Sequence, residues 1–308
     1  MRILVLGAGA VGGYFGGRLH EAGEDVTFLV RSQRKQQLDE AGLVIRSTHG
    51  DYQARVKTIV TGEAADPFDV VLFSVKAYHL EQSFIDLEPY VSEKTMVIPL
   101  LNGITHLARL DEVFGKERVL GGLCFIETTL NEAGEIEQFS DQHDLVFGER
   151  DGSTSKRVER FQSAIHKTKV NGSKSDKIKV AMWQKYLFLS VFSGITSLMG
   201  ESIGPIREVP GGRETIQELV SEVAIVAHSQ EPELNEGVAD ITFSILDNLS
   251  GSMKSSMLRD IEKKGEVEAD HLHGALLKMA PEGAELPRLT AVYAFLKVYE
   301  GKRQQGRL

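Results

Sequence analysis

The 308-residue sequence has a single cysteine, one tryptophan and no long hydrophobic run, and its acidic residues outnumber its basic ones. Cys124 has no partner in the chain, which excludes an internal disulfide, and its apolar neighbours predict a small buried side chain. The longest apolar stretch, residues 186–199, is too short to span a bilayer and contains several serines. No cysteine–histidine cluster has the spacing of a metal site, so we expect none.

The net charge and the first residues of the chain argue against two further classes, nucleic-acid-binding proteins and secreted proteins. A net charge of −9 without a long basic run argues against binding nucleic acid through its phosphates. The first apolar run already reads as a strand, so we expect no signal peptide and a cytoplasmic protein that does not contact membranes. At 308 residues the chain is too long for one compact core, which predicts two domains.

The chain begins with a short apolar run that leads directly into Gly-x-Gly-x-x-Gly. In a strand–turn–helix unit Gly7 allows a tight turn, Gly9 leaves the backbone open to a pyrophosphate, and Gly12 lets the helix pack against the strand. A helical pattern over residues 11–21 and a second strand pattern over residues 26–30 complete the βαβ unit that dinucleotide binding requires. The cofactor-binding residues expected in this loop are Gly7, Ala8, Gly9, Ala10, Val11 and Gly12.

The end of the second predicted strand indicates which dinucleotide binds. NAD sites of this type place Asp or Glu there for the ribose hydroxyls, whereas this chain has Arg31 followed by Ser32. A guanidinium pairs with the 2′-phosphate that a carboxylate would repel, so we predict NADPH rather than NADH. The alternative is that Arg31 and Arg34 are solvated residues opening the next helix, and for Arg34 both interpretations stay open.

Strand and helix patterns alternate through residues 1–176 and give way to helices alone in residues 177–308. The fold class is therefore α/β, with an N-terminal Rossmann-type dinucleotide-binding domain followed by an all-helical C-terminal domain. A turn at residues 131–134 predicts a hairpin, residues 171–176 a turn-rich domain junction, and the residues from 301 onward a frayed tail. The other strands expected are 43–46, 53–60, 69–75, 95–101, 119–129, 135–139 and 145–147, and the later helices are 181–198, 212–229, 237–249, 266–280 and 286–299.

Lys185 is the only charged residue in a helical segment that is apolar nearly all round. Burial disfavours an ammonium ion and lowers its pKa toward the range in which it can give up a proton in catalysis. The flexible stem of a lysine can equally carry the ammonium from an apolar helix to solvent. The residue pattern leaves both interpretations open.

Other polar residues stand at the ends of predicted elements. Lys76 and Asn102 each follow an apolar strand, and ligands of open parallel sheets bind beyond the carboxyl ends of strands. Each residue alone is more often a helix cap or a loop residue, and His79 fits either role. Farther along, Ser255 reads as a helix N-cap, and Glu268 reads as an ordinary acid at a helix start.

Together these segments resemble the ketopantoate reductase (2-dehydropantoate 2-reductase) family. The resemblance rests on the glycine loop, the Val-Lys-Ala and Leu-Asn-Gly strand ends, Trp-Gln-Lys on a helix, and Ser-Ser-Met-Leu-Arg-Asp followed by a glutamate. These motifs occur in the right order and cover nearly the whole chain. They include Lys76, Asn102, Lys185, Ser256 and Glu268.

The resemblance implies NADPH-dependent reduction of ketopantoate to a 2-hydroxy acid, a step toward pantothenate, in a cleft between the two domains. Lys185 would polarise the keto oxygen and deliver its proton, and Ser256 would bind the substrate carboxylate. Asn102 and Glu268 would hold the substrate and the nicotinamide ribose, with Lys76 contributing from the cofactor side. The helical domain would also form a homodimer, as often in the family.

One departure from the family pattern concerns the substrate. Family members have asparagines one and two helical turns after the lysine, where this chain has Leu189 and Ser193. Because residues four apart share a helix face, Lys185, Leu189 and Ser193 are expected to line one wall. Leucine cannot hydrogen-bond a substrate hydroxyl, which makes a more apolar 2-keto acid the alternative substrate. An NADPH-sensing protein without turnover is a third hypothesis, against which Lys185 and Glu268 argue.

Overall fold

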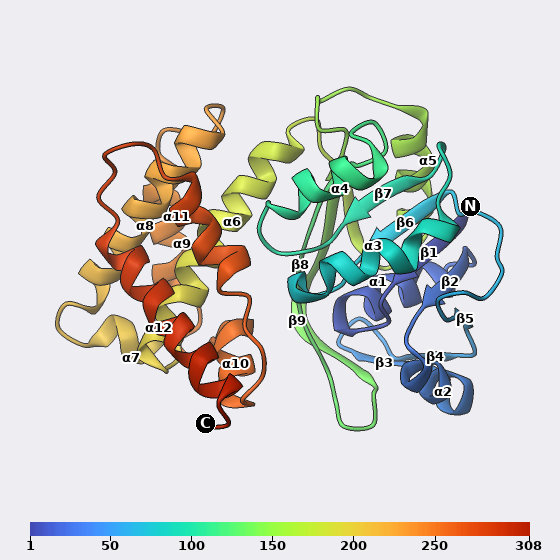
Figure 1. Cartoon of the computed structure of the whole chain (residues 1–308), viewed down its shortest axis with the longest axis horizontal. Coiled ribbons are helices and arrows are strands. Elements are labelled where there is room, and N and C mark those ends of the chain that lie inside the picture. Colours follow the sequence, from blue (N-terminus) through green and yellow to red (C-terminus); the bar gives the residue numbers. More distant parts are fainter. The chain divides into compact units, whose positions relative to one another are not determined.

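The computed structural model describes residues 1–308, and they form two compact units. Unit 1 consists of Met1–Leu101 and His106–Ile178, and unit 2 consists of Asn102–Thr105 and Lys179–Leu308. Unit 1 contains all the strands, and unit 2 is helical, as the α/β fold class predicts (Figure 1). None of the helices combines the length and the hydrophobicity needed to cross a membrane.

A five-stranded parallel sheet in the order β5-β2-β1-β6-β7 forms one part of unit 1. Its strands β1, β6 and β7 are continuous apolar runs that are buried along nearly their whole length, as expected where helices cover both faces of a parallel sheet. The strands are β1 (Arg2–Leu6), β2 (Asp25–Leu29), β5 (Lys57–Ile59), β6 (Val70–Phe73) and β7 (Met96–Pro99). The helices of unit 1 are α1 (Ala10–Glu21), α2 (Ser32–Ala41), α3 (Leu80–Leu87), α4 (His106–Phe114) and α5 (Lys156–Ile165), with 3₁₀ turns η1 (Ala77–His79) and η2 (Glu88–Tyr90).

A second sheet of unit 1 has the order β10-β9-β3-β4, with β8 paired to β9. The β8–β9 pair is antiparallel and closes through the predicted turn, where Gly134 has a φ of +77° and the Asn131 side chain accepts a hydrogen bond from the Glu135 N–H. The hairpin prediction is therefore confirmed. The strands are β3 (Leu43–Ser47), β4 (Tyr52–Ala54), β8 (Gly121–Leu130), β9 (Ile136–Gly148) and β10 (Asn171–Lys174).

Several strand predictions in unit 1 are wrong in their extent. The predicted strand 53–60 is two strands, because β4 pairs with β3 while β5 leaves to extend the parallel sheet beside β2. The predicted strands 135–139 and 145–147 are one strand, β9, which continues through the polar residues between them because β8 pairs along both parts. The turn-rich junction predicted at 171–176 includes strand β10, which pairs with β9.

Unit 2 is built around α6 (Ile178–Met199), which is apolar nearly all round and packs in a core that includes Leu187, Val191 and Ile195. Figure 1 shows its helices in yellow to red. The predicted helix 266–280 begins only at a π-helical turn. The tail predicted from residue 301 onward is helical as far as Gln304, and only residues 305–308 are exposed and outside the helix. The remaining elements are α7 (Ile203–Glu208), α8 (Gly212–Gln230), α9 (Val238–Asn248), α10 (Ser256–Glu262), the π turn η3 (Asp270–Gly274), α11 (Ala275–Met279) and α12 (Pro287–Gln304).

Candidate active site

The glycine loop of unit 1 has the geometry of an anion-binding turn. Gly7 follows β1 with a φ of +92°, a conformation that favours glycine, and Gly9 is the N-cap of α1 and has no side chain to cap the helix. A Cβ added at Gly9 would meet no protein atom within 4 Å, whereas at Gly12 it would lie 2.1 Å from Ser74 Oγ. The protein therefore fills the space beside Gly12 and leaves the space beside Gly9 open, next to uncapped N–H groups. This arrangement fits a dinucleotide pyrophosphate.

The basic residues near this loop have different surroundings. Arg31 is exposed at the N-cap of α2, and its guanidinium donates to His79 Nδ1 at 3.2 Å. Arg34 is half-buried, and its guanidinium donates to the carbonyls of Ala8 at 3.1 Å and Gly134 at 2.8 Å. The solvated interpretation of Arg34 is therefore wrong, because the residue ties the glycine loop to the β8–β9 turn. Lys76 is exposed between β6 and η1.

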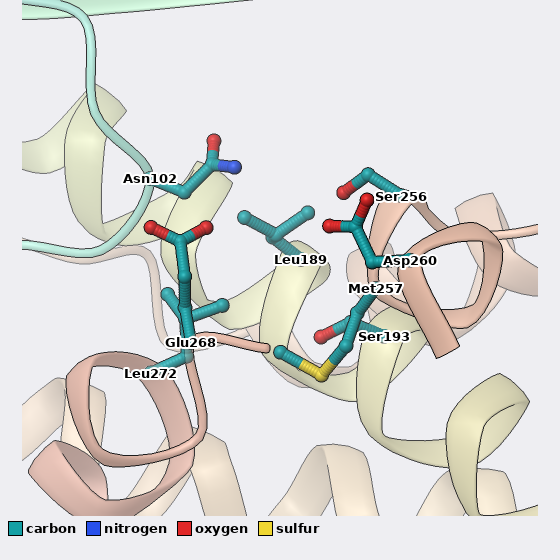
Figure 2. A pocket seen from close by; sticks show the side chains of 8 residues that line it. All are labelled: Asn102, Leu189, Ser193, Ser256, Met257, Asp260, Glu268 and Leu272. Atoms are coloured by element: carbon teal, nitrogen blue, oxygen red, sulfur yellow. The ribbon is translucent and has the colours of Figure 1, made fainter. Parts of the chain in front are cut away.

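Unit 2 contains a pocket of mixed polarity (Figure 2). Figure 2 shows Asn102 and Glu268 on one side, Ser256 and Asp260 on the other, and Leu189 between them. These side chains come from four segments, namely the loop after β7, α6, α10 and the segment before η3. The residues that line the pocket are Asn102, Leu189, Ser193, Ser256, Met257, Asp260, Glu268 and Leu272.

Lys185 lies beside this pocket on α6. It is half-buried, and its Nζ donates to Asn102 Oδ1 at 3.1 Å. Leu189 and Ser193 follow at intervals of four on the same helix, and both line the pocket. This bond holds the ammonium at the side-chain oxygen of a residue that lines the pocket.

Helix α10 presents Ser256 and Asp260 to the pocket. The helix begins as the sequence predicts, because Ser255 Oγ accepts a hydrogen bond from the Leu258 N–H at 3.1 Å. Residues four apart share a helix face, which explains why Ser256 and Asp260 line the pocket together.

The pocket is supported by buried hydrogen bonds between α6 and η3. Burial raises the pKa of Tyr186, whose hydroxyl donates to the Leu272 carbonyl. Burial lowers the pKa of His273 to about 4, so the imidazole is neutral at neutral pH and donates from Nε2 to the Ser190 carbonyl at 2.9 Å. Both bonds fix the pocket wall formed by α6 against the turn that follows Glu268.

Of the eight residues that line the pocket, five were predicted from the sequence as site residues and three were not. Asn102, Leu189, Ser193, Ser256 and Glu268 were expected to meet, and the structure brings them together. Met257, Asp260 and Leu272 were not expected to line a site. Asp260 could have been found from its spacing of four after Ser256, whereas Met257 and Leu272 look in sequence like core residues.

The comparisons with known proteins match both units. The family model for ketopantoate reductase PanE/ApbA matches residues 3–152, and the model for the C-terminal part of the same family matches residues 177–300. The uncharacterized oxidoreductase YkpB of Bacillus subtilis is 42% identical over 98% of this chain and 100% of its own length.

Solved structures show the same fold. The crystal structure of 2-dehydropantoate 2-reductase from Geobacter metallireducens superposes with a TM-score of 0.88 at 28% identity and covers 97% of this chain and 99% of its own. A D-mandelate dehydrogenase solved with NADH and anilino(oxo)acetate has a TM-score of 0.87 at 22% identity, over 99% of this chain and 100% of its own, and shares the fold. With both family models matched in order along nearly all of its length, this chain belongs to the ketopantoate reductase family of oxidoreductases.

Proposed function

We propose that this protein reduces a 2-keto acid to the 2-hydroxy acid with NADPH. The observation that carries the proposal is the ammonium of Lys185, held by the side-chain oxygen of Asn102 beside a pocket that Ser256 and Glu268 also line. Hydride addition to a keto carbon builds negative charge on its oxygen, and a positioned ammonium stabilises that charge. Membership of the ketopantoate reductase family supports the same reaction.

Each site residue has its own role in the proposed reaction. Lys185 polarises the keto oxygen and gives it a proton as the C2 carbon accepts hydride, so that the keto group becomes a hydroxyl. Ser256 binds the substrate carboxylate through its hydroxyl. Asn102 and Glu268 hold the substrate and the nicotinamide ribose, and Lys76 contributes from the cofactor side.

The glycine loop would hold the dinucleotide, which supplies the hydride when bound. The open space at Gly9 and the uncapped start of α1 support pyrophosphate binding. Arg31, exposed at the end of β2 where NAD enzymes carry a carboxylate, supports NADPH over NADH. Replacing Arg31 by Ala should weaken NADPH binding more than NADH binding, as measured by titration of cofactor fluorescence.

Two substrates have specific support. Ketopantoate is favoured by the family and would place the protein on the route to pantothenate. A more apolar branched 2-keto acid is favoured by Leu189, Met257 and Leu272, which give the pocket apolar walls. The D-mandelate dehydrogenase neighbour shows that the fold alone does not select ketopantoate.

A screen of small 2-keto acids for NADPH consumption tests the proposal. We expect turnover with ketopantoate or ketoisovalerate, lower turnover with NADH, and loss of turnover in Lys185→Ala. Lys179→Ala is the matched control, because Lys179 lies on the same helix but is exposed and pairs with Glu231. A Lys185→Ala variant as active as the wild type would refute the mechanism. NADPH binding without turnover of any keto acid would favour the sensor hypothesis.

The oligomeric state is a separate proposal. We propose a homodimer, which sedimentation equilibrium would detect as twice the chain mass of 34.0 kDa.

A further inference from the structure

The loop that carries Asn102 is held at both of its ends by one histidine. His271 Nε2 lies 2.8 Å from the carbonyl oxygen of Asn102, and its Nδ1 lies 3.0 Å from Thr105 Oγ1. Between these contacts the chain turns at Gly103, which has a φ of +78°. A Cβ at Gly103 would lie 3.2 Å from His271 Nε2, so the loop packs directly on the imidazole. The carbonyl can only accept, so Nε2 carries a proton and donates to it.

His271 belongs to the π turn η3, which connects the segments that build the pocket. π-helical turns are frequent at functional sites. Three other residues of this turn, Asp270, Leu272 and His273, also make hydrogen bonds to other segments of unit 2. The turn follows Glu268 and includes Leu272, both of which line the pocket. These bonds join Asp270 to Tyr293 and Lys297 of α12, Leu272 to Tyr186 of α6, and His273 to Ser190 of α6.

We propose that His271 is a positioning residue of the reaction: it fixes the loop at Asn102 and Thr105 and thereby sets the Asn102 amide against the ammonium of Lys185. The inference rests on the proposed function of Lys185. His271 contacts the backbone of Asn102, while the side chain of Asn102 contacts Lys185 Nζ at 3.1 Å. The imidazole therefore acts through Asn102.

The expected size of the effect follows from the geometry. Without the imidazole the loop loses the contacts that fix its two ends, and Asn102 Oδ1 no longer holds one position. A misplacement of about 1 Å near reacting groups costs about 100-fold in rate. We therefore expect His271→Ala to lower kcat by about 10- to 100-fold and to change the KM for NADPH little.

Two variants separate this role from a general loss of structure. His271→Gln keeps a side-chain N–H able to donate to the Asn102 carbonyl and should recover most of kcat. His228→Gln is the matched control, because His228 in α8 also contacts two carbonyls of unit 2, those of Ala224 and Asn235. It should leave kcat unchanged. A kcat for His271→Ala equal to that of the wild type would overturn the proposal.

A double-mutant cycle tests whether His271 acts through Asn102. In the Asn102→Ala background, His271→Ala should lower kcat by less than about twofold, because the group that it positions is already absent. If the effects of the two substitutions on kcat multiply in full, His271 does not act through Asn102 and the proposal is wrong.

A second measurement does not depend on activity. The ¹³Cε resonance of Lys185, assigned with Lys185→Arg, should shift in the same direction in His271→Ala and in Asn102→Ala, and should stay in place in His228→Gln. A wild-type protein that reduces no keto acid would refute the proposed function, and this resonance would still decide whether His271 positions Lys185. An unshifted resonance in His271→Ala would overturn the positioning role even if the enzyme is active.

Discussion

The side chain of Leu189 projects from α6 into the pocket, between Asn102 and Glu268 on one side and Ser256 and Asp260 on the other (Figure 2). In the proposed reaction Ser256 binds the substrate carboxylate and Lys185 polarises the keto oxygen. Leucine itself offers neither a donor nor an acceptor to a substrate hydroxyl at this point. We therefore expect Leu189 to favour a substrate without a hydroxyl at this point.

Leu189→Asn should shift the preference of the enzyme toward the hydroxylated substrate. An amide placed there can bind the hydroxyl of ketopantoate, and we expect the ratio of kcat/KM for ketopantoate over ketoisovalerate to rise about tenfold. Leu189→Ile keeps the wall apolar and should leave the ratio close to that of the wild type. An unchanged ratio in Leu189→Asn would mean that the hydroxyl binds elsewhere.

Lys264, just after α10, is the only residue other than glycine with a positive φ, of 55°. This conformation costs an L-residue about 1–2 kcal/mol, of which glycine recovers part. Lys264→Gly should therefore raise the free energy of unfolding of unit 2 by about 1 kcal/mol. The single tryptophan, Trp183, is buried in the core of unit 2, so its fluorescence during urea unfolding reports on this unit.

Lys263→Gly is the control for this substitution. The φ of Lys263 is −84°, which any residue adopts, so glycine there gains nothing and makes the unfolded chain more flexible. Unit 2 should become less stable in this variant. A lower stability of Lys264→Gly as well would show that its side-chain contact with Leu308 outweighs the backbone strain.

At the level of elements, we expect one glycine of the turn between β1 and α1 to be needed for folding and another for binding the cofactor. A Cβ at Gly12 would lie 2.1 Å from Ser74 Oγ and 2.3 Å from the Gly7 carbonyl oxygen. Gly12→Ala should therefore destabilise unit 1 by about 2 kcal/mol, as measured by calorimetry. Gly9→Ala meets no protein atom within 4 Å, so it should fold normally and bind NADPH at least about tenfold more weakly.

The two variants control for each other. Cofactor titration and calorimetry on the same preparations distinguish weak binding from weak folding. Normal NADPH affinity in Gly9→Ala would contradict a pyrophosphate at this turn.

The elements that the sequence predicts well are those whose signals are local. The β1–α1 turn follows from glycine spacing, and the β8–β9 hairpin from its turn residues. The division of residues 53–60 was not predictable, because β5 leaves its neighbour to pair with β2 in the other sheet. The join of residues 135–148 into β9 likewise depends on pairing with β8. Sheet membership is decided by such distant partners, which the residues of a strand do not encode by themselves.

The site residues also divide into those with a local sequence signal and those that depend on distant partners. Lys185, Leu189 and Ser193 share a helix face, and their alignment follows from a spacing of four. His271 was not found, because its partners Asn102 and Thr105 lie 169 and 166 residues away in sequence. Nothing near His271 in the chain distinguishes it from an ordinary helix residue.

At the scale of the whole molecule, each unit contains a buried histidine whose pKa is lowered by burial. In unit 1, burial lowers the pKa of His143 to about 4, with smaller contributions from His49 and Arg18, and its Nδ1 lies 2.7 Å from the Tyr14 hydroxyl. In unit 2, burial lowers the pKa of His273 to about 4 against the opposing effect of its bond to the Ser190 carbonyl. Both units should therefore be sensitive to mild acid.

The direction of this effect in unit 2 follows from proton linkage. Between about pH 6.5, where an unfolded histidine titrates, and pH 4, the unfolded chain binds a proton that folded His273 does not. Stability is therefore lost as the pH falls through this range, and His273 contributes a loss of about 2 kcal/mol between about pH 7 and pH 4.5. His273→Gln, which is neutral throughout, should remove this part of the loss.

Urea unfolding followed by Trp183 fluorescence at both pH values measures the difference between the wild type and His273→Gln. The comparison cancels the carboxylates that titrate in the same range, because both proteins contain them. An equal loss in His273→Gln would mean that folded His273 takes up a proton as readily as the unfolded chain does. The proton would then be taken up at Nδ1, and the hydrogen bond from Nε2 to the Ser190 carbonyl would remain.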